Sequence, residues 1–479
     1  MAKTKKTKKQ RKRVINREYR NVMLLFTGLF VLMTGYLIYF QVVKSRATIN
    51  NSYNARLETF EHQVIRGNIL SSDGQVLACT EVDAEGKERR VYPFDSAFAH
   101  VVGYSQFGKT GIEALGNFQL LTSSAPFMEK FIHELKGEKN RGDSLITTLD
   151  VTLQMAAYEA LGNHKGAVIV MEPATGNVRA LVSKPDFHPE QILSDWPTLS
   201  SSSDGVLLNR ATQGLYPPGS VFKSVTLLAY LREHRLMADG YTYQCDGKVT
   251  VGDFSIRCYR GKQHGELDLK KAYAKSCNSA FAEIGTALDV KEFRTLSKEL
   301  LFDAELPLEL PYSKSLFQLK ESDTEAIRMM TAIGQAETLV TPMHMAMLTS
   351  AAANKGVLMV PRFLEQTENY LEDTIVERYP VTTYGPLFSV DEATVLKEYM
   401  RAVVEDGTAS ALQSERYTAS GKTGTAEYSN DKSKSHAWFA GYAEGEKETL
   451  VVCVIVEGAG SGSEYAVPIA KRIFDTYYQ

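Results

Sequence analysis

Three short motifs that stand far apart in the sequence constrain the fold of this chain more than any other feature. They are Ser220-Val-Phe-Lys223, Ser276-Cys-Asn278 and Lys422-Thr-Gly-Thr425. Together they hold a hydroxyl nucleophile, an amine that can act as a base, a second hydroxyl and a strand-forming segment, which is a full set for serine acyl transfer. Each pattern is short enough to arise by chance, so their order and wide spacing carry the information. The fold must bring all three motifs to one site.

The first motif places a serine and a lysine one helical turn apart. Pro217 and Pro218 precede Ser220, and proline suits the start of a helix because its missing N–H group has no partner there. Lys223 then lies on the same helical face as Ser220. This lysine can accept the serine proton only when it is neutral. Burial and a nearby cation such as Lys422 would lower its pKa toward that state. On this motif alone, an ordinary exposed serine and lysine is the alternative.

The second and third motifs supply a proton relay and contacts to the substrate. Ser276 can pass a proton between Lys223 and an amine, and Asn278 can hold a substrate amide. Lys422–Thr425 is typical of an edge strand, whose backbone can pair with an extended peptide.

The third motif also offers groups for the ends of such a peptide. Gly424 would let the peptide approach closely, and Lys422 with the hydroxyls of Thr423 and Thr425 can bind a terminal carboxylate. The backbone N–H groups of Ser220 and Thr425 would form an oxyanion hole.

The N-terminus predicts a membrane anchor. The first 20 residues contain ten Lys or Arg and one acid, and Val22–Phe40 carries no charge. Nineteen residues at about 1.5 Å each nearly span a hydrocarbon core of about 30 Å. Under the positive-inside rule, residues 1–20 are a cytoplasmic tail, residues 21–43 cross the membrane, and the rest lies outside. A nucleic-acid-binding arm is the other reading of such a basic run, but the adjacent apolar span favours the membrane.

The remaining chain divides at about residue 145. Residues 44–145 are polar and rich in turn residues, which predicts a small strand-rich pedestal. Residues 146–479 predict one α+β domain in which helices flank a mixed or mostly antiparallel sheet. Its expected elements are a helix over 151–161 capped by Asp150, a hairpin over 166–183, strands over 418–427, 436–443 and 449–457, and a final helix over 466–477.

The ordered motifs and their surroundings resemble the class B penicillin-binding proteins, the peptidoglycan D,D-transpeptidases, in a short form. Further segments that match this family's pattern are Arg66–Leu70 with Asp73-Gly74, Gly108–Glu113, Gly334-Gln335 with Thr341-Pro342, and His436–Phe439. The resemblance implies a serine β-lactamase-like transpeptidase domain. It implies cross-linking of stem peptides from a lipid-linked precursor: a D-Ala-D-Ala donor acylates the serine, terminal D-Ala leaves, and an acceptor amine takes the acyl group.

The resemblance also implies covalent acylation by β-lactams, no required cofactor and no nucleic-acid partner. It implies work beside a multi-spanning glycan polymerase of the shape, elongation, division and sporulation family. A D,D-carboxypeptidase, in which water replaces the acceptor amine, is an alternative on the same machinery. A remote alternative is a P-loop NTPase, because Gly103–Thr110 fits G-x-x-x-x-G-K-[S/T]. That reading needs a strand over Ala97–Val102 and a helix after Thr110.

A group of possible metal ligands precedes the second motif. Cys245, Cys258 and His264 lie within twenty residues, with Asp246 and Asp253 among them. Such side chains can form a structural zinc site, a Cys245–Cys258 disulfide is an equally simple arrangement, and free thiols are the third possibility. The spacing alone does not separate the three. A zinc ion here would hold the loop that carries Ser276 and Asn278.

Overall fold

The computed structural model describes residues 2–40, 63–236, 240–428 and 434–479. The chain forms two compact units, residues 1–59 and 60–479, which are treated separately below. Residues 44–62, the first part of the predicted pedestal, lie outside the described segments.

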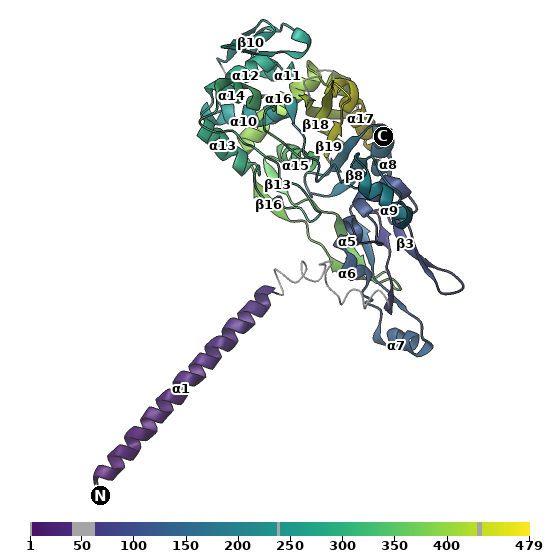
Figure 1. The fold of residues 1–479 in the computed structure, drawn as a ribbon, viewed down its shortest axis with the longest axis vertical. Helices are drawn as coiled ribbons and strands as arrows, with labels where there is room; N and C mark the ends of the chain where they lie inside the picture. The colour runs from purple at the N-terminus through teal and green to yellow at the C-terminus, as the bar shows by residue number, and fades with distance from the viewer. Residues whose placement is uncertain (1, 41–62, 237–239, 429–433) are drawn as a thin grey trace. The chain divides into compact units, whose positions relative to one another are not determined.

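The described part of the first unit is one long helix, α1 (Ala2–Tyr39) (Figure 1). Its segment Tyr19–Tyr39 is long and apolar enough to cross a membrane. The hydroxyls of Thr27 and Thr34 donate to backbone carbonyls one turn earlier in the same helix, so these polar groups are satisfied without water. Residues 21–39 of the predicted span 21–43 lie in α1, and residues 41–43 lie outside the described residues.

The centre of the second unit is a five-stranded sheet in which all neighbouring strands are antiparallel (Figure 1). Its strands, in spatial order, are β17 (Tyr417–Glu427), β18 (Ser435–Gly445), β19 (Leu450–Val456), β7 (Gly166–Met171) and β8 (Val178–Lys184). Every residue of β7 and β19 is buried, which requires cover on both faces. The strand β17 is an edge of this sheet.

Helices supply that cover. The helices α8 (Val151–Leu161) and α17 (Gly462–Tyr477) pack against each other and against the sheet, and α15 (Pro342–Ala353) packs against the central strands. The side chain of Asp150 accepts from the N–H group of Leu153 and caps α8, as predicted. The predicted hairpin, the three C-terminal strands and the final helix are also confirmed, with ends that differ by a few residues at most.

A helical region lies beside the edge strand β17. It contains η4 (Gly219–Phe222) followed by α10 (Lys223–Glu233), α11 (Leu269–Ala274), α12 (Asn278–Ala287), α13 (Val290–Glu299), α14 (Glu325–Ala332) and α16 (Val390–Glu405). Both η4 and α16 contact β17, and α10 contacts α12. The first motif therefore spans η4 and the start of α10, the second spans the junction of α11 and α12, and the third lies in β17 itself.

A second sheet has six strands drawn from distant parts of the sequence. Its order is β15 (Ile375–Arg378), β14 (Leu364–Glu368), β6 (Ser144–Thr147), β2 (Ile69–Leu70), β3 (Val76–Val82) and β4 (Glu88–Val91). Beside it, buried Glu113 accepts from the guanidinium groups of both Arg66 and Arg90 at 2.6–2.7 Å. These three residues tie together separate segments of the predicted pedestal.

The segment that fits the P-loop pattern does not have the required structure. The residues before Gly103 form helical turns, η2 (Asp95–Phe98) and α4 (Ala99–Val102), so the strand considered over Ala97–Val102 is wrong. The helix that follows, α5 (Gly111–Leu115), has five residues and contains Glu113 of the buried ion pairs. Packing of Ala97–Val102 into the core as helix outweighs its strand-like composition.

Candidate active site

The candidate nucleophile Ser220 lies in a single helical turn, η4, that continues into α10 at Lys223. Gly219 has φ +54°, and a Cβ atom there would lie 2.7 Å from the carbonyl oxygen of Thr425. Only glycine allows both this left-handed backbone and this close approach. The turn that presents Ser220 is therefore held directly against the edge strand β17, and Ser220 is half-buried.

Lys223 is fully buried, and its amine is directed at the second motif. The Nζ atom donates to the carbonyl oxygen of Ser276 at 2.8 Å and to Asn278 Oδ1 at 2.8 Å, and it lies 3.3 Å from Ser276 Oγ. Among the described residues, the Ser220 hydroxyl has no hydrogen-bond partner. The bond expected between Ser220 and Lys223 is thus not formed in this structure, although hydrogen bonds of catalytic groups are often completed only when substrate binds.

Ser276 adopts a strained backbone at the end of α11. Its φ is +55°, in the left-handed region that glycine favours. The N–H of Cys277 donates to the carbonyl of Ala272 and the N–H of Ser276 to that of Tyr273, which is the Schellman pattern of a helix end. Glycine is the usual residue at this position, so a serine here indicates that the hydroxyl is needed.

Lys422 joins the third motif to the second. It is 1 % exposed, and its Nζ donates to Ser276 Oγ at 2.8 Å and to the Thr423 carbonyl at 3.1 Å. The Ser276 hydroxyl thus lies between two amines, those of Lys223 and Lys422. In the described part of the chain, neither amine forms an ion pair with a carboxylate.

Burial sets the protonation of both lysines. Removal from water lowers the pKa of Lys223 to about 8. Burial also lowers the pKa of Lys422 well below its usual range, and the nearby Lys223 cation lowers it further. The pKa of Lys223 is lowered by burial and not by the predicted influence of Lys422, whereas Lys223 does lower the pKa of Lys422. The pair therefore binds fewer protons near neutral pH than two exposed lysines would.

Gly424 has a packing role between the Ser220 turn and the sheet. A Cβ atom at this residue would lie 2.9 Å from Trp438 Cβ and 3.1 Å from both the Pro218 carbonyl oxygen and Val221 Cγ1. The missing side chain thus makes room for the Ser220 turn and for the neighbouring strand. The predicted edge position of Lys422–Thr425 is confirmed.

The structure adds residues that sequence reasoning missed. The hydroxyl of Thr408 shares a hydrogen bond with that of Thr423, which is buried. The indole N–H of Trp438 donates to the Pro217 carbonyl at 3.1 Å and fixes the approach to Ser220. Thr408 lies in a loop without a motif of its own, so only the fold reveals its position.

The cysteine cluster lies next to this site. Sγ of Cys258 is 3.7 Å from Sγ of both Cys245 and Cys277, and Cys245 Sγ is 3.3 Å from His264 Nδ1. All four potential ligand atoms lie within 4.8 Å of one another. Cys277 was not among the predicted ligands, whereas the predicted Asp246 and Asp253 are outside the group that the described residues form.

Cys277 escaped prediction because it is the middle residue of the Ser276–Asn278 motif and far from the other cysteines in sequence. Strands β10 (Lys248–Val251) and β11 (Phe254–Arg257) form a hairpin whose two ends carry the segments of Cys245 and Cys258. All five cysteines are free, and 3.7 Å greatly exceeds the S–S bond length of about 2.05 Å. The disulfide considered above is not formed in this structure.

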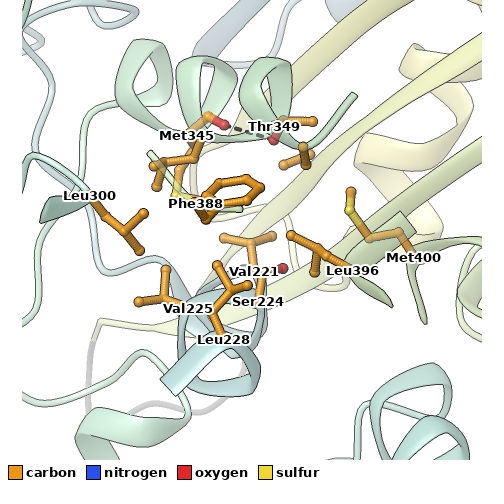
Figure 2. Close-up of a pocket in the computed structure, with 13 residues that line it drawn as sticks. Val221, Ser224, Val225, Leu228, Leu300, Met345, Thr349, Phe388, Leu396 and Met400 are labelled. Atoms are coloured by element: carbon orange, nitrogen blue, oxygen red, sulfur yellow. Dashed lines mark hydrogen bonds between the residues drawn. The ribbon is translucent and has the colours of Figure 1, made fainter. Parts of the chain in front are cut away.

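An apolar cavity lies behind the nucleophile turn, and its lining does not include Ser220, Lys223 or Lys422 (Figure 2). Val221, Ser224 and Val225 line one side, and Met345 and Thr349 of α15 line another. The Thr349 hydroxyl donates to the Met345 carbonyl within α15, so this polar group is already satisfied. The cavity is a packing gap between α10 and α15, distinct from the candidate active site.

Comparisons with known proteins agree with this geometry. A family model described as the penicillin binding protein transpeptidase domain matches residues 166–475, and one described as the penicillin binding protein A dimerisation domain matches residues 66–145. The chain is 29 % identical to the peptidoglycan D,D-transpeptidase PbpA of Mycolicibacterium smegmatis, over 95 % of this chain and 98 % of that protein. It is 26 % identical to stage V sporulation protein D of Bacillus subtilis, over 80 % of this chain and 63 % of that protein.

The chain is also similar in structure to a solved penicillin-binding protein. The imipenem acyl-enzyme complex of penicillin-binding protein A from M. tuberculosis superimposes with a TM-score of 0.77 at 26 % identity. The similarity covers 88 % of this chain and 100 % of the solved chain.

Proposed function

From the premise that this chain belongs to the penicillin-binding protein transpeptidase family, we propose how its active-site residues divide the work of acyl transfer. The protein is a serine D,D-transpeptidase that cross-links peptidoglycan and is acylated by β-lactams. The observation that carries the assignment of roles is the Ser276 hydroxyl between two buried amines, beside the Ser220 turn and the edge strand β17.

In the first half-reaction, Ser220 Oγ attacks the carbonyl carbon of the penultimate D-alanine of the donor. The serine proton passes to neutral Lys223, and an ester bond forms as the peptide bond breaks. The leaving amine of terminal D-alanine takes up a proton delivered through Ser276. Atoms and charge balance, because the proton lost by Ser220 equals the proton gained by the leaving amine.

The hydrogen bonds of Ser276 suit this relay. A hydroxyl can donate one hydrogen bond and accept others, so Ser276 can accept from one protonated lysine while donating to one neutral lysine. A donor carboxylate bound near Lys422 would raise the pKa of that amine and favour its protonated form. We therefore propose that donor binding draws the shared proton to Lys422 and leaves Lys223 neutral.

Substrate is held by the edge strand. The donor peptide pairs with the backbone of β17, and Lys422, Thr423 and Thr425 bind its terminal carboxylate. Thr408 orients the Thr423 hydroxyl through their shared hydrogen bond. The N–H groups of Ser220 and Thr425 stabilise the oxyanion, supported by the contact of Gly219 with Thr425. Asn278, held by Lys223 and by the Arg257 carbonyl, binds a substrate amide.

In the second half-reaction an acceptor amine attacks the ester, gives its proton to the Lys223–Ser276 pair, and releases Ser220. Water in place of the amine would give a D,D-carboxypeptidase.

The test of transpeptidation supplies a stem-peptide donor ending in D-Ala-D-Ala together with a soluble amine acceptor. We expect release of D-alanine and a product in which donor and acceptor are joined. Release of D-alanine with only hydrolysed donor would favour the carboxypeptidase.

Membrane orientation and partner follow from the same premise. We propose that the basic residues before α1 stay in the cytoplasm, that residues from about 44 onward lie outside, and that the protein works on lipid-linked precursor beside a multi-spanning glycan polymerase. We propose the chain division 1–20, 21–43, 44–145 and 146–479. The family matches over 66–145 and 166–475 support this division, while strands β14 and β15 join the pedestal sheet from the later part.

We also propose a structural zinc site formed by Cys245, Cys258, Cys277 and His264. A Zn–S bond of about 2.3 Å in a tetrahedral site places two sulfur atoms about 3.8 Å apart. Cys258 lies 3.7 Å from both other sulfur atoms, so the observed spacing fits a metal ion between them. Three thiolates and one imidazole are a common structural zinc set.

The position of Cys277 in the sequence indicates what a metal ion at this site would stabilise. It lies between Ser276 and Asn278, in the segment that links α11 to α12. A metal ion that binds Cys277 would hold the strained backbone of Ser276 and the direction of Asn278 while remaining outside the acyl-transfer chemistry. Zinc is thus proposed as a support for the relay and not as a reactant.

Metal analysis tests this site. We expect one zinc ion per chain in protein purified without chelator, and loss of that zinc in Cys258→Ser but not in Cys79→Ser. Because Cys258→Ser could misfold, cobalt substitution of the wild-type protein gives a second readout. A thiolate-to-cobalt absorption band is expected. Zinc-free protein with five titratable thiols and no cobalt band would contradict the proposal.

A further inference from the structure

The helix α7 (Phe127–Lys136) has an apolar face on which all five large side chains are exposed. At 100° per residue, its five large apolar side chains fall in one arc of about 140°, and its five polar side chains fill the rest of the circumference. The apolar set is Phe127, Met128, Phe131, Ile132 and Leu135. Phe127 is 79 % exposed and Leu135 is 72 % exposed, and no residue of the helix is buried.

The polar side of α7 attaches the helix to the rest of its unit. The Lys130 amine donates to the Ser123 carbonyl at 2.7 Å, and the His133 ring lies 3.0 Å from Asn140 Oδ1. The apolar arc is therefore turned outward by contacts on the opposite side. Figure 1 shows α7 at the end of the 60–479 unit, beyond α6 (Asn117–Leu120).

The helix α7 lies next in sequence to the partner of the first strand of its unit. Strand β5 (Asn140–Arg141) follows α7 after a short turn and pairs in parallel with β1 (Val64–Ile65), the first strand of the unit. Twenty-three residues lie between Phe40 and Val64. They can span at most about 80 Å, so this length of chain keeps the unit that contains α7 within reach of a membrane crossed by α1.

We propose that the apolar face of α7 binds the surface of this bilayer and lies at the boundary of headgroups and acyl chains. Segregated faces, with Phe and Leu on the apolar side, are typical of interfacial helices. A single convex helix needs a matching groove in a protein partner, whereas fluid lipid adapts to its shape. The polar face carries Glu129, Lys130, Glu134 and Lys136, whose charges cancel, so apolar burial provides the attraction and anionic lipid is not required.

This proposal rests on α1 crossing a membrane and not on the assignment of catalytic roles. The test uses full-length protein in nanodiscs of phosphatidylcholine with brominated acyl chains, which quench tryptophan at close range. Phe131→Trp places a probe on the apolar face. Tyr259→Trp is the matched control, because Tyr259 is also an exposed aromatic residue and lies in η5 (Tyr259–Gly261), beyond the β10–β11 hairpin. Trp196 and Trp438 give the background in unmodified protein.

We expect bromine to quench the added fluorescence of Phe131→Trp at least twofold more than that of Tyr259→Trp. Phe127→Ser and Leu135→Ser, added to Phe131→Trp, should abolish this difference while penicillin labelling stays unchanged. Equal quenching at the two positions in nanodiscs that contain lipid alone would overturn the proposal. This holds even if adding a membrane protein then changes the fluorescence of Phe131→Trp. Penicillin labelling of the same samples reports the enzymatic function independently.

Discussion

At the scale of single residues, two buried lysines share one serine hydroxyl and have no carboxylate partner in the described structure. Lys223 and Lys422 both contact Ser276, and burial lowers the pKa of each. Burying a cation without a counter-charge raises the free energy of the folded state, which favours the neutral form of at least one of the two amines. This is the condition that a lysine base requires.

The pH dependence of acylation follows from the pKa of Lys223. Because the base acts only when deprotonated and its pKa is about 8, acylation by a penicillin should slow as pH falls below about 8 and reach a plateau above it. Lys223→Arg keeps a cation but removes the base, since guanidinium remains protonated, and should slow acylation by orders of magnitude at every pH. Stopped-flow acylation measures both. A flat wild-type profile between pH 6 and 9 would exclude this base.

Two substitutions of Ser276 distinguish the cost of its strained backbone from the chemical role of its hydroxyl. Ser276→Gly should relieve the left-handed φ and leave stability unchanged or raise it by up to about 1 kcal/mol, whereas Ser276→Ala retains the strain. Both lose the hydroxyl, so both should acylate at least about a hundredfold more slowly. Thermal unfolding and acylation rates give the two readouts. Near-normal acylation in Ser276→Gly would show that the hydroxyl is not needed.

At the scale of elements, the site depends on how closely the Ser220 turn approaches β17. Gly424→Ala would place a Cβ atom 2.9 Å from Trp438 Cβ and 3.1 Å from the Pro218 carbonyl oxygen. We expect a loss of about 1–3 kcal/mol in stability and slower acylation, because the turn must move away from the strand. Denaturant unfolding and penicillin acylation measure these effects. Unchanged stability with reduced peptide binding would instead favour the original reading of this glycine.

Elements with local signals could be predicted from sequence, and contacts between elements could not. Asp150 before an apolar-periodic segment marked the start of α8, and the turn between β7 and β8 marked a hairpin. Nothing near Thr408 or Cys277 in sequence indicates Thr423 or Cys258 as a neighbour, because the fold creates those contacts. The contact of Lys223 with Ser276 was expected from the proton relay, whereas its hydrogen bond to Asn278 was not.

At the scale of the whole molecule, helix and strand signals at both ends of residues 146–479 predicted an α+β domain, and the family resemblance implied its transpeptidase fold. The sequence also indicated one membrane span, and the structure has one helix over Tyr19–Tyr39 that is long and apolar enough. The helical form of Ala97–Val102 was missed because a short apolar run fits either a strand or a buried helix.

Membrane topology gives a test at this scale. With an epitope tag before Met1, protease added outside intact protoplasts should digest the enzyme domain under conditions that unfold it and leave the tagged α1 fragment protected. The reason is the ten basic residues before the span, which hold the N-terminus in the cytoplasm. Loss of the tag with an intact enzyme domain would reverse the orientation and contradict a role outside the cell.

The central claim is that Ser220 carries the acyl group. Peptide mapping by mass spectrometry after reaction with penicillin tests it most directly, with Ser224→Ala as the control because Ser224 lies one turn further along and its hydroxyl contacts Tyr273. We predict one penicilloyl group per chain, on Ser220, in wild type and Ser224→Ala, and none in Ser220→Ala. Stoichiometric acylation of Ser220→Ala, or an adduct on another residue in wild type, would contradict the account.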